Sequence, residues 1–398
     1  MKQLIQSLYE MADYPLTNKA LYARLAEKGF NAEQYGAAGK ETHNLFFRRV
    51  RWIQQSLKQE GIVTRIDRSE WGVSNNHRIK LRSINCAKGM IAMSTRLGVA
   101  IWGDSALIGK QVIDEPVHLV LSSPPYPLKS PRAYGNPDID EYIDFLSRVL
   151  EPWVANLAKG GSIALNVSND IFEDKSPARS TYLEELTLAL KKRFSLHLMD
   201  RLIWTSNKAP GPYQWASKKH YQLNVGYEFV IWLTNDPLAC FSDNQQVLQA
   251  HSDAHINFVA RGGVSQASAY GDGAYIKQLG AYSNETAGRI PTNVLNFSNY
   301  CGSGRRVSRY ARQNGLPEHG AKFPESLSRF LVNFLSKPGQ LVVDTFGGTL
   351  TVGESAEISG RRWICIDMMW EYIRQSFPRF TQFGDDTYWN PAFLNACA

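Results

Sequence analysis

The chain has 398 residues, of which 43% are hydrophobic and 20% are charged, and it carries a formal net charge of +7. This composition is typical of a globular protein and excludes a chain built around membrane spans, because no apolar run is long enough to cross a bilayer. The five cysteines are scattered without a C-x-x-C pair, which indicates neither a disulfide framework nor a zinc site, so we expect no metal.

The first part of the chain is basic. Residues 1–85 contain 14 Lys and Arg against 8 Asp and Glu. Thr17 is placed to cap a first helix, a second helix is expected at about 44–60, and residues 62–81 indicate two short strands around a turn. We predict a winged-helix-like module over residues 1–90. Its charge suits contact with nucleic acid, and a purely solvent-exposed surface explains it equally well.

From residue 98 the pattern changes to strands that alternate with helices. The expected elements are a strand at Val117–Ser123, a helix at Tyr142–Ala158, a strand at Gly160–Ser168, a helix at Tyr182–Arg193 and two strands within 198–235. Such alternation predicts an α/β fold with a Rossmann-like, doubly wound and mostly parallel sheet. We assign 98–235 to the first half of this domain.

Residues 236–318 lack a clear period and are rich in Gly, Ala, Ser and Tyr. We expect an insertion of variable structure without its own hydrophobic core. The sheet pattern resumes over 319–398, with a helix at 324–335 and a strand, glycine turn, helix and strand at 340–368.

The stretch Ser123-Pro124-Pro125-Tyr126 ends the first buried strand. Proline can simply terminate a strand, because it donates no ladder hydrogen bond. The same stretch can also form a rigid clamp for a flat polar ligand, since ligands of doubly wound sheets bind at the carboxyl ends of strands.

A second motif, DTFGGTLTVGESAE, begins at Asp344. A glycine turn between strand and helix lets a ligand approach the backbone, and Asp367 ends the next strand, where such folds hold a ribose. Neither G-x-G-x-x-G nor G-K-[ST] is present, which favours a cofactor with a ribose but no pyrophosphate. An adenosyl sulfonium fits this description, and an ordinary strand–helix turn is the alternative.

Taken in order, these motifs resemble those of the amino-group DNA methyltransferases. SPPY resembles their catalytic motif, and DTFGGTLT resembles their S-adenosylmethionine turn, usually D-P-F-x-G-S-G-T. The catalytic motif comes first, as in the circularly permuted beta group. WGDS, HGAKFPESL, RLIWTSN and GYEFVIWLTN add to the resemblance, which covers about 100–369. Within the group S-P-P-Y usually marks N4-cytosine enzymes, whereas D-P-P-Y and N-P-P-Y usually mark N6-adenine enzymes.

The resemblance implies a set of site residues. The catalytic residues are Ser123, Pro124, Pro125 and Tyr126. The residues that bind S-adenosylmethionine are Asp104, Ser105, Phe323, Pro324, Asp344, Phe346, Gly347, Gly348 and Asp367. Apart from the resemblance, Lys129 and Arg132 follow the clamp and are expected to contact DNA phosphates, with a solvated loop as the equal alternative. The acid-free run with Arg305, Arg306, Arg309 and Arg312 is expected to contact phosphates or guanine edges. Thr345 and Leu350 depart from the usual turn, where proline and glycine stand, and we expect a local adjustment there.

The sequence therefore predicts transfer of a methyl group from S-adenosylmethionine to N4 of a flipped-out cytosine in duplex DNA. The setting would be the cytoplasm of a prokaryote, at the nucleoid, with a restriction endonuclease as a functional partner. Alternatives are N6-adenine methylation, methylation of RNA or protein, and an inactive DNA-binding module. No Pro-Cys nucleophile motif is present, which argues against attack on the cytosine ring carbon.

Overall fold

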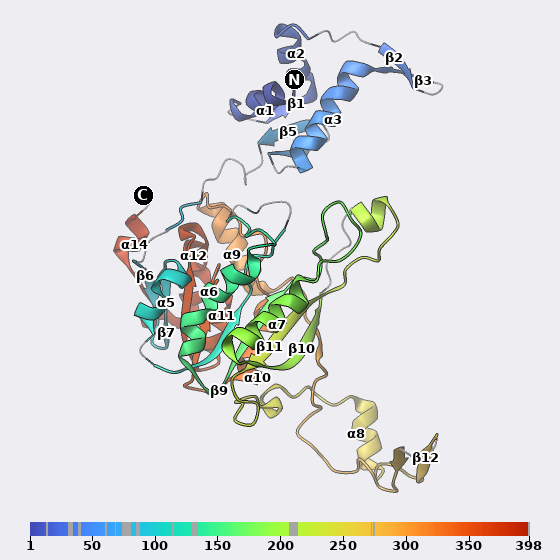
Figure 1. Cartoon of the computed structure of the whole chain (residues 1–398), viewed down its shortest axis with the longest axis vertical. Coiled ribbons are helices and arrows are strands. Elements are labelled where there is room, and N and C mark those ends of the chain that lie inside the picture. Colours follow the sequence, from blue (N-terminus) through green and yellow to red (C-terminus); the bar gives the residue numbers. More distant parts are fainter. Residues whose placement is uncertain are drawn as a thin grey trace.

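The computed structural model describes residues 1–12, 15–30, 35–38, 41–59, 62–67, 69–73, 81–84, 88–113, 115–128, 132, 134–206, 214–271, 273 and 275–396. A small N-terminal module is joined to a large α/β body (Figure 1). No helix within these ranges is long and apolar enough to cross a membrane.

The N-terminal module contains three helices and short strands. They are α1 (Lys2–Glu10), β1 (Leu16–Thr17), α2 (Asn18–Glu27), β2 (Tyr35–Ala38), β3 (Glu41–Asn44), α3 (Leu45–Gln59), β4 (Val63–Asp67) and β5 (Glu70–Val73). The Thr17 hydroxyl accepts a hydrogen bond from Ala20 N at 3.1 Å, as the capping pattern predicts. The strands β1, β5 and β4 pair in that order. The expected helices and hairpin are present, and the winged-helix assignment stays a prediction.

The body is built on one ten-stranded sheet in the order β14-β10-β11-β9-β8-β15-β16-β7-β6-β17. The first five strands in chain order are β6 (Met90–Ser94), β7 (Gly98–Trp102), β8 (Val117–Ser122), β9 (Leu157–Val167) and β10 (His197–Thr205). The others are β11 (Tyr227–Thr234), β14 (Val294–Asn296), β15 (Leu341–Asp344), β16 (Arg362–Asp367) and β17 (Tyr388–Trp389). Strands β9, β8, β15, β16 and β7 are mutually parallel, whereas β11 and β6 run against their neighbours. The mostly parallel α/β sheet is thereby confirmed.

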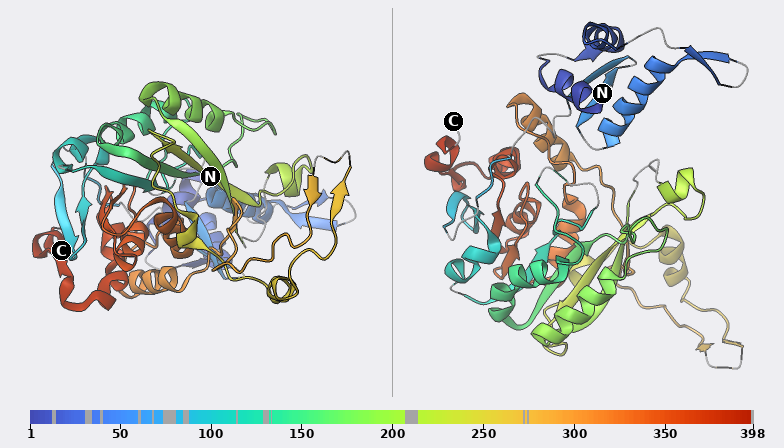
Figure 2. Two further views of the ribbon diagram at one scale, coloured as in Figure 1. Left: turned by 90° about the horizontal axis from the view of Figure 1, so that it is seen from below. Right: turned by 45° about the horizontal axis from the view of Figure 1, so that its top comes forward.

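Helices cover both faces of this sheet, as the doubly wound pattern predicts (Figure 2). One face carries α5 (Ser105–Val112), α6 (Tyr142–Ala155) and α7 (Tyr182–Phe194). The other carries α10 (Glu325–Leu335), α11 (Thr351–Ile358), α12 (Trp370–Gln375), α13 (Phe377–Phe380) and α14 (Pro391–Asn395). A separate hydrophobic core, centred on Leu21, Val50 and Leu57, holds the N-terminal module. Shorter turns are η1 (Gln214–Lys218), η2 (Asn244–Val247) and η3 (Thr381–Asp386).

The last part of the stretch 236–318 contains more secondary structure than its composition indicates. Helix α8 (Asp253–Ala260) and the hairpin β12 (Ser268–Tyr270) and β13 (Tyr275–Lys277) lie at one end of the molecule (Figure 1). By contrast, β14 pairs in parallel with β10 of the large sheet. Helix α9 (Gly302–Gln313) buries Val307 and Ala311 and contacts α12 and α13. The arginine-rich segment is therefore a helix packed on the body.

Candidate active site

The first motif follows β8, where the chain leaves the sheet. The Tyr126 hydroxyl lies 3.0 Å from Asn166 Oδ1 and 2.9 Å from Glu228 Oε2. The Ser123 hydroxyl donates to the same Asn166 oxygen at 3.4 Å. Burial and the neighbouring Glu228 carboxylate raise the pKa of Tyr126 well above its usual range, so the phenol keeps its proton. Among the described residues, no hydrogen-bond donor reaches the carbonyl oxygen of Pro124.

Asn166 and Glu228 are site residues that the sequence did not single out. Asn166 is the next-to-last residue of β9, and Glu228 is the acid of GYEF at the start of β11. Because β11 pairs against β9, Val230 lies opposite Asn166 and brings Glu228 to the same edge of the sheet. The acid in GYEF was the available signal, but only the antiparallel pairing shows where it lies.

The second motif forms the turn after β15, next to β8 in the sheet. The buried carboxylate of Asp344 accepts from the Ser122 hydroxyl at 2.9 Å and from Phe346 N at 3.0 Å. Burial raises the pKa of Asp344 to about 7. The Ser105 hydroxyl donates to the Thr345 carbonyl at 2.9 Å. Asp344 thus lies beneath the turn and fixes its shape.

The two departures from the usual turn have local explanations. Thr345 donates its backbone N–H to the Ser122 hydroxyl at 2.9 Å, a bond that proline cannot make. Leu350 adopts the left-handed φ of +55°, the conformation that glycine favours. Its side chain is fully buried in the core beneath the cleft and does not line it. The expected local adjustment is therefore a strained leucine that points away from the site.

Asp367 ends β16 and faces the cleft. Its two carboxylate oxygens accept from Gly348 N at 2.7 Å and from Met369 N at 2.8 Å. Burial raises the pKa of Asp367 to about 6, while the two amides oppose that rise. Gly348 has a φ of +49°, and a Cβ there would lie 3.3 Å from His319 Nε2. A larger residue at this position would therefore crowd the His319 ring and would be held in a left-handed backbone conformation.

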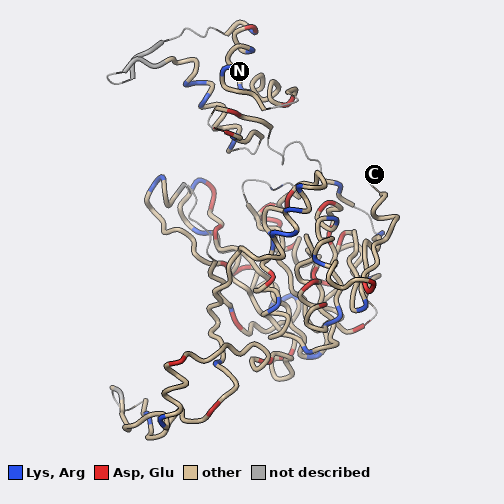
Figure 3. Tube along the Cα trace, turned by 180° about the vertical axis from the view of Figure 1, so that it is seen from behind, with Lys and Arg blue, Asp and Glu red and all other residues tan. Residues whose placement is uncertain are grey.

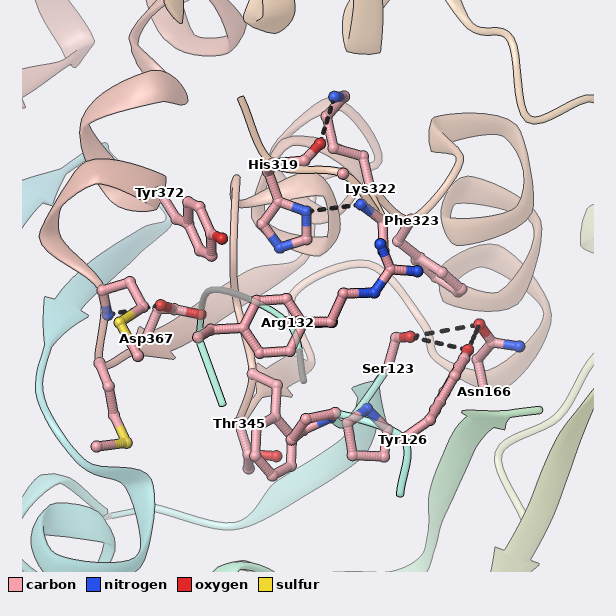
Figure 4. A pocket seen from close by; sticks show the side chains of 18 of the residues that line it. Ser123, Tyr126, Arg132, Asn166, His319, Lys322, Phe323, Thr345, Asp367 and Tyr372 are labelled. Carbon is pink, nitrogen blue, oxygen red and sulfur yellow. Dashed lines mark hydrogen bonds between the residues drawn. The ribbon is translucent and has the colours of Figure 1, made fainter. Parts of the chain in front are cut away.

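One cleft of about 1600 Å³ joins the two motifs. Figure 4 shows Asp367 on one side and Ser123 with Tyr126 on the other. The predicted residues that line it are Asp104, Ser105, Ser123, Pro124, Pro125, Tyr126, Arg132, Arg305, Arg309, Arg312, Phe323, Pro324, Phe346 and Asp367. Those that do not line it are Arg306, Asp344, Gly347 and Gly348.

Several of these residues have contacts of their own. Arg306 lies 3.3 Å from the buried Glu354 carboxylate, and Arg312 lies 2.8 Å from Glu318. Asp104 caps α5 by accepting from Ala106 N at 2.9 Å, while it also lines the cleft. Lys129 lies outside the described residues.

His319 forms part of the cleft wall near Tyr372 (Figure 4) and belongs to a cluster of three rings with Tyr372 and Tyr134. Its ring centroid lies 4.3 Å from that of Tyr372 and 5.9 Å from that of Tyr134. Burial and the nearby Lys322 ammonium lower the pKa of His319 to about 3, so the imidazole is neutral at physiological pH. This wall therefore presents aromatic surface to a ligand.

Comparison with known proteins gives the site its context. The family model described as DNA methylase matches residues 117–378, about two thirds of the chain. The chain belongs to the DNA methylase family. The matched region contains the SPPY stretch, the Asp344 turn and Asp367. The N-terminal module of the methylase lies outside it.

The methylase is similar to curated proteins and solved structures. It is 28% identical to the Type II methyltransferase M.PvuII of Proteus hauseri, over 73% of this chain and 85% of that protein. It is 24% identical to the DNA adenine methyltransferase YhdJ of Escherichia coli (strain K12), over 70% of this chain and 81% of that protein. The solved PvuII DNA methyltransferase (cytosine-N4-specific) matches with a TM-score of 0.56 and 24% identity, covering 76% of this chain and 94% of its own. This structural match supports the fold.

Proposed function

We propose that this methylase transfers a methyl group from S-adenosylmethionine to N4 of a cytosine flipped out of duplex DNA. The observation that carries the proposal is the shared cleft: SPPY at the end of β8 and Asp367 at the end of β16 open into the same space. Its volume of about 1600 Å³ exceeds that of a usual single-ligand pocket, which suits a cofactor and a base together.

The cofactor side of the cleft fits an adenosyl group. Phe346, Phe323 and Pro324 supply apolar wall, and Asp367 retains lone pairs for the two hydroxyls of a ribose. Gly348 keeps the turn free of a side chain. When bound, S-adenosylmethionine supplies an electrophilic methyl group on a sulfonium. The buried Asp344 and Ser105 would then act through the turn that they hold.

The target side fits an exocyclic amine. Its two hydrogens would be accepted by the Ser123 hydroxyl and the Pro124 carbonyl, which the two prolines fix in place before reaction. The nitrogen lone pair then forms the new N–C bond as the C–S bond breaks, and the sulfur keeps that electron pair. The methylated nitrogen would then be cationic and would lose its surplus proton to solvent water, because a neutral hydroxyl and a carbonyl are too weakly basic to keep it. Positioning supplies much of the rate, since the methyl group is already activated.

Tyr126 would stack on the flipped base. Its hydroxyl is held by Asn166 and Glu228, so the ring enters the reaction already oriented. Stacking of a base on an aromatic ring is worth about 1–3 kcal/mol. Asn166 and Glu228 are thus positioning residues for the clamp.

The choice of cytosine depends on Ser123 and on similarity. S-P-P-Y usually marks N4-cytosine enzymes, and the solved relative in the comparison is named as cytosine-N4-specific. N6-adenine methylation is the second candidate, because another relative is named a DNA adenine methyltransferase. Both bases present a flat exocyclic amine to the same clamp.

Duplex DNA would lie along the arginines of the cleft mouth. Arg132, Arg305 and Arg309 are exposed and line the cleft, which suits contacts to phosphates. Arg306 would instead hold α9 through Glu354. We propose that residues 236–318 recognise the target sequence. In this proposal residues 98–235 and 319–398 are the catalytic and cofactor-binding halves of the methyltransferase domain, and residues 1–90 are an added module. A cognate restriction endonuclease is the proposed functional partner.

The test is to expose unmethylated DNA to the protein and S-adenosylmethionine, and to identify the modified base by mass spectrometry. We expect N4-methylcytosine, with none from Ser123→Ala and at least tenfold less from Tyr126→Ala. If N6-methyladenine were the only modified base, the proposed target would be adenine and not cytosine. Methylation by Ser123→Ala at the wild-type rate would refute the clamp.

A further inference from the structure

Helix α3 of the N-terminal module presents a basic face that lies outside the family match. The helix Leu45–Gln59 carries Arg48, Arg49, Arg51 and Lys58 and no acid. All four cations are exposed, and Figure 3 shows Lys and Arg positions along this helix. Within the described part of the chain, no carboxylate lies within 4.0 Å of the three arginines. Their charges are therefore available to a partner.

The opposite face of α3 is firmly anchored. Phe46, Val50 and Leu57 are buried in the core of the module. Gln54 is fully buried and donates to the Tyr9 hydroxyl at 2.7 Å and to Asn18 Oδ1 at 2.8 Å. These bonds tie α3 to α1 and to the start of α2. The exposed face is consequently held in one orientation, which lowers the entropy cost of binding.

Trp52 lies at the centre of the exposed face. Its side chain is 77% exposed, although a tryptophan gains much free energy from burial. Arg48 stands one turn before it, and Gln55 stands nearly one turn after it on the same face. Leu45, 42% exposed and two turns before Trp52, is the other large apolar side chain exposed on α3, and the two together are too little apolar surface for a membrane-surface helix. This face has the composition of a surface that contacts a polyanion.

We propose that α3 binds duplex DNA, with Arg48, Arg49 and Arg51 on phosphates and Trp52 on the sugar or base edges between them. The helix has 15 residues and so spans about 22 Å, enough to lie in or along a major groove. DNA is the polyanion that a member of this family encounters. This contact goes beyond the proposed methyl transfer and adds a second DNA-binding surface to the cleft.

The experiment measures the affinity of the full chain for a labelled random-sequence duplex of about 40 base pairs, at several concentrations between about 50 and 200 mM NaCl. No cofactor is added, so the result does not depend on the proposed methyl transfer. The test variant carries Arg48→Gln, Arg49→Gln and Arg51→Gln. The matched control carries Lys191→Gln, Lys192→Gln and Arg193→Gln on the exposed end of α7.

We expect the α3 variant to bind at least tenfold more weakly at about 100 mM salt. The slope of the logarithm of the binding constant against the logarithm of the salt concentration should become shallower by about 2–3, because each lost phosphate contact reduces that slope by nearly one. Replacing the same three arginines by lysine should keep the slope. Trp52→Ala should weaken binding about three- to tenfold without changing the slope, because tryptophan carries no charge.

An α3 glutamine variant that binds like the α7 control, with an unchanged slope, would overturn the proposal. Near-ultraviolet circular dichroism of both triple variants establishes that the fold is intact. The lysine variant separates lost charge from lost structure. If the protein proved inactive toward cytosine and adenine, these binding results would still stand.

Discussion

At the residue scale, Asp367 is the side chain that we propose accepts from the cofactor ribose, so its ionisation state bears on the proposed cofactor binding. Its pKa is raised to about 6 from 3.8, so ionising it costs folding free energy. The folded protein binds this proton more tightly than the unfolded chain, and its contribution to stability falls as pH rises from about 4 to about 6. A ribose hydroxyl, however, donates best to the ionised form. Stability and cofactor affinity should thus respond to pH in opposite directions.

We predict that affinity for S-adenosylmethionine rises about tenfold between about pH 5 and pH 7, as a group with this pKa ionises. Asp367→Asn should bind more weakly and lose this dependence. Calorimetric titration at several pH values measures both. Asp344, whose pKa is about 7, remains in the variant, so a pH step that persists would assign the effect to Asp344 instead.

Leu350 combines an unfavourable backbone conformation with a fully buried side chain. Removing the side chain should cost about 2–5 kcal/mol through lost burial and the cavity left behind. The left-handed conformation costs a non-glycine residue roughly 1–2 kcal/mol. Burial wins, so both Leu350→Ala and Leu350→Gly should be less stable than the wild type.

The order of these two variants is the sharper prediction. Glycine avoids the strain, and Leu350→Gly should exceed Leu350→Ala in stability by about 1 kcal/mol. Urea unfolding of both variants measures the difference. If alanine were the more stable, as it is inside an ordinary helix, then the positive φ would not contribute to strain at this turn.

At the element scale, a buried ion pair joins three helices behind the cleft. The Arg379 guanidinium of α13 contacts the Glu354 carboxylate of α11 and the Ser303 hydroxyl of α9, and all three side chains are buried. Its second terminal nitrogen donates to Thr349 at 3.2 Å and to Thr351 at 3.0 Å, beside the turn that follows β15. The arginine helix and the turn therefore share one polar anchor.

We predict that Arg379→Met lowers the free energy of unfolding by about 3–5 kcal/mol, because it leaves the Glu354 charge buried with less compensation. The double variant Arg379→Met, Glu354→Leu should lose less than the single variant, since no buried charge then remains. Chemical denaturation of both gives the comparison. A double variant that is less stable than the single one would show that the pair itself stabilises the fold.

The sequence predicted those helices and strands whose own residues carry a clear pattern, and it missed several whose position depends on distant parts of the chain. The strands β8, β9, β15 and β16 are apolar runs bounded by glycine or proline, and α6, α7 and α10 follow a clear helical period. The two-residue strand β17 escaped prediction, because its partner β6 lies nearly 300 residues earlier in the chain. Strand β6 also escaped, although it pairs with the nearby β7. Helix α9 escaped because its buried stripe amounts to two small apolar residues, Val307 and Ala311, within an arginine-rich segment.

The same contrast holds within the site. Ser123, Tyr126 and Asp367 stand at strand ends next to recognisable turns, so their place at the cleft followed from the parallel sheet. Asn166 and Glu228 became visible only through the antiparallel β9–β11 pair, whose direction no local pattern specifies. Likewise, the motif that begins at Asp344 predicted a turn at the cleft. The position of the Asp344 side chain beneath that turn is seen only from its hydrogen bonds to Ser122 and Phe346.

At the scale of the whole molecule, the N-terminal module and the body have separate hydrophobic cores. Leu21 is fully buried in the first and Leu331 in the second. Leu21→Ala should cost its module about 2–5 kcal/mol and leave cofactor affinity unchanged, because no side chain of its core reaches the cleft. Leu331→Ala is the matched change in the body.

Differential scanning calorimetry with and without S-adenosylmethionine checks this prediction. The Leu21 variant should lower one thermal transition and spare the transition that the cofactor raises, whereas the Leu331 variant should lower the latter. A shift of both transitions by Leu21→Ala would mean that the two parts unfold as one unit.

The position of β15 and β16 near the middle of the large sheet has a consequence for biogenesis. Strand β15 pairs with β8, more than 200 residues earlier, and β16 pairs with β7, more than 250 residues earlier. During translation β7 and β8 therefore emerge long before the neighbours that will separate them. Until then their exposed backbone edges can recruit other nascent chains. Production of this enzyme should accordingly be sensitive to chaperone supply and to growth temperature.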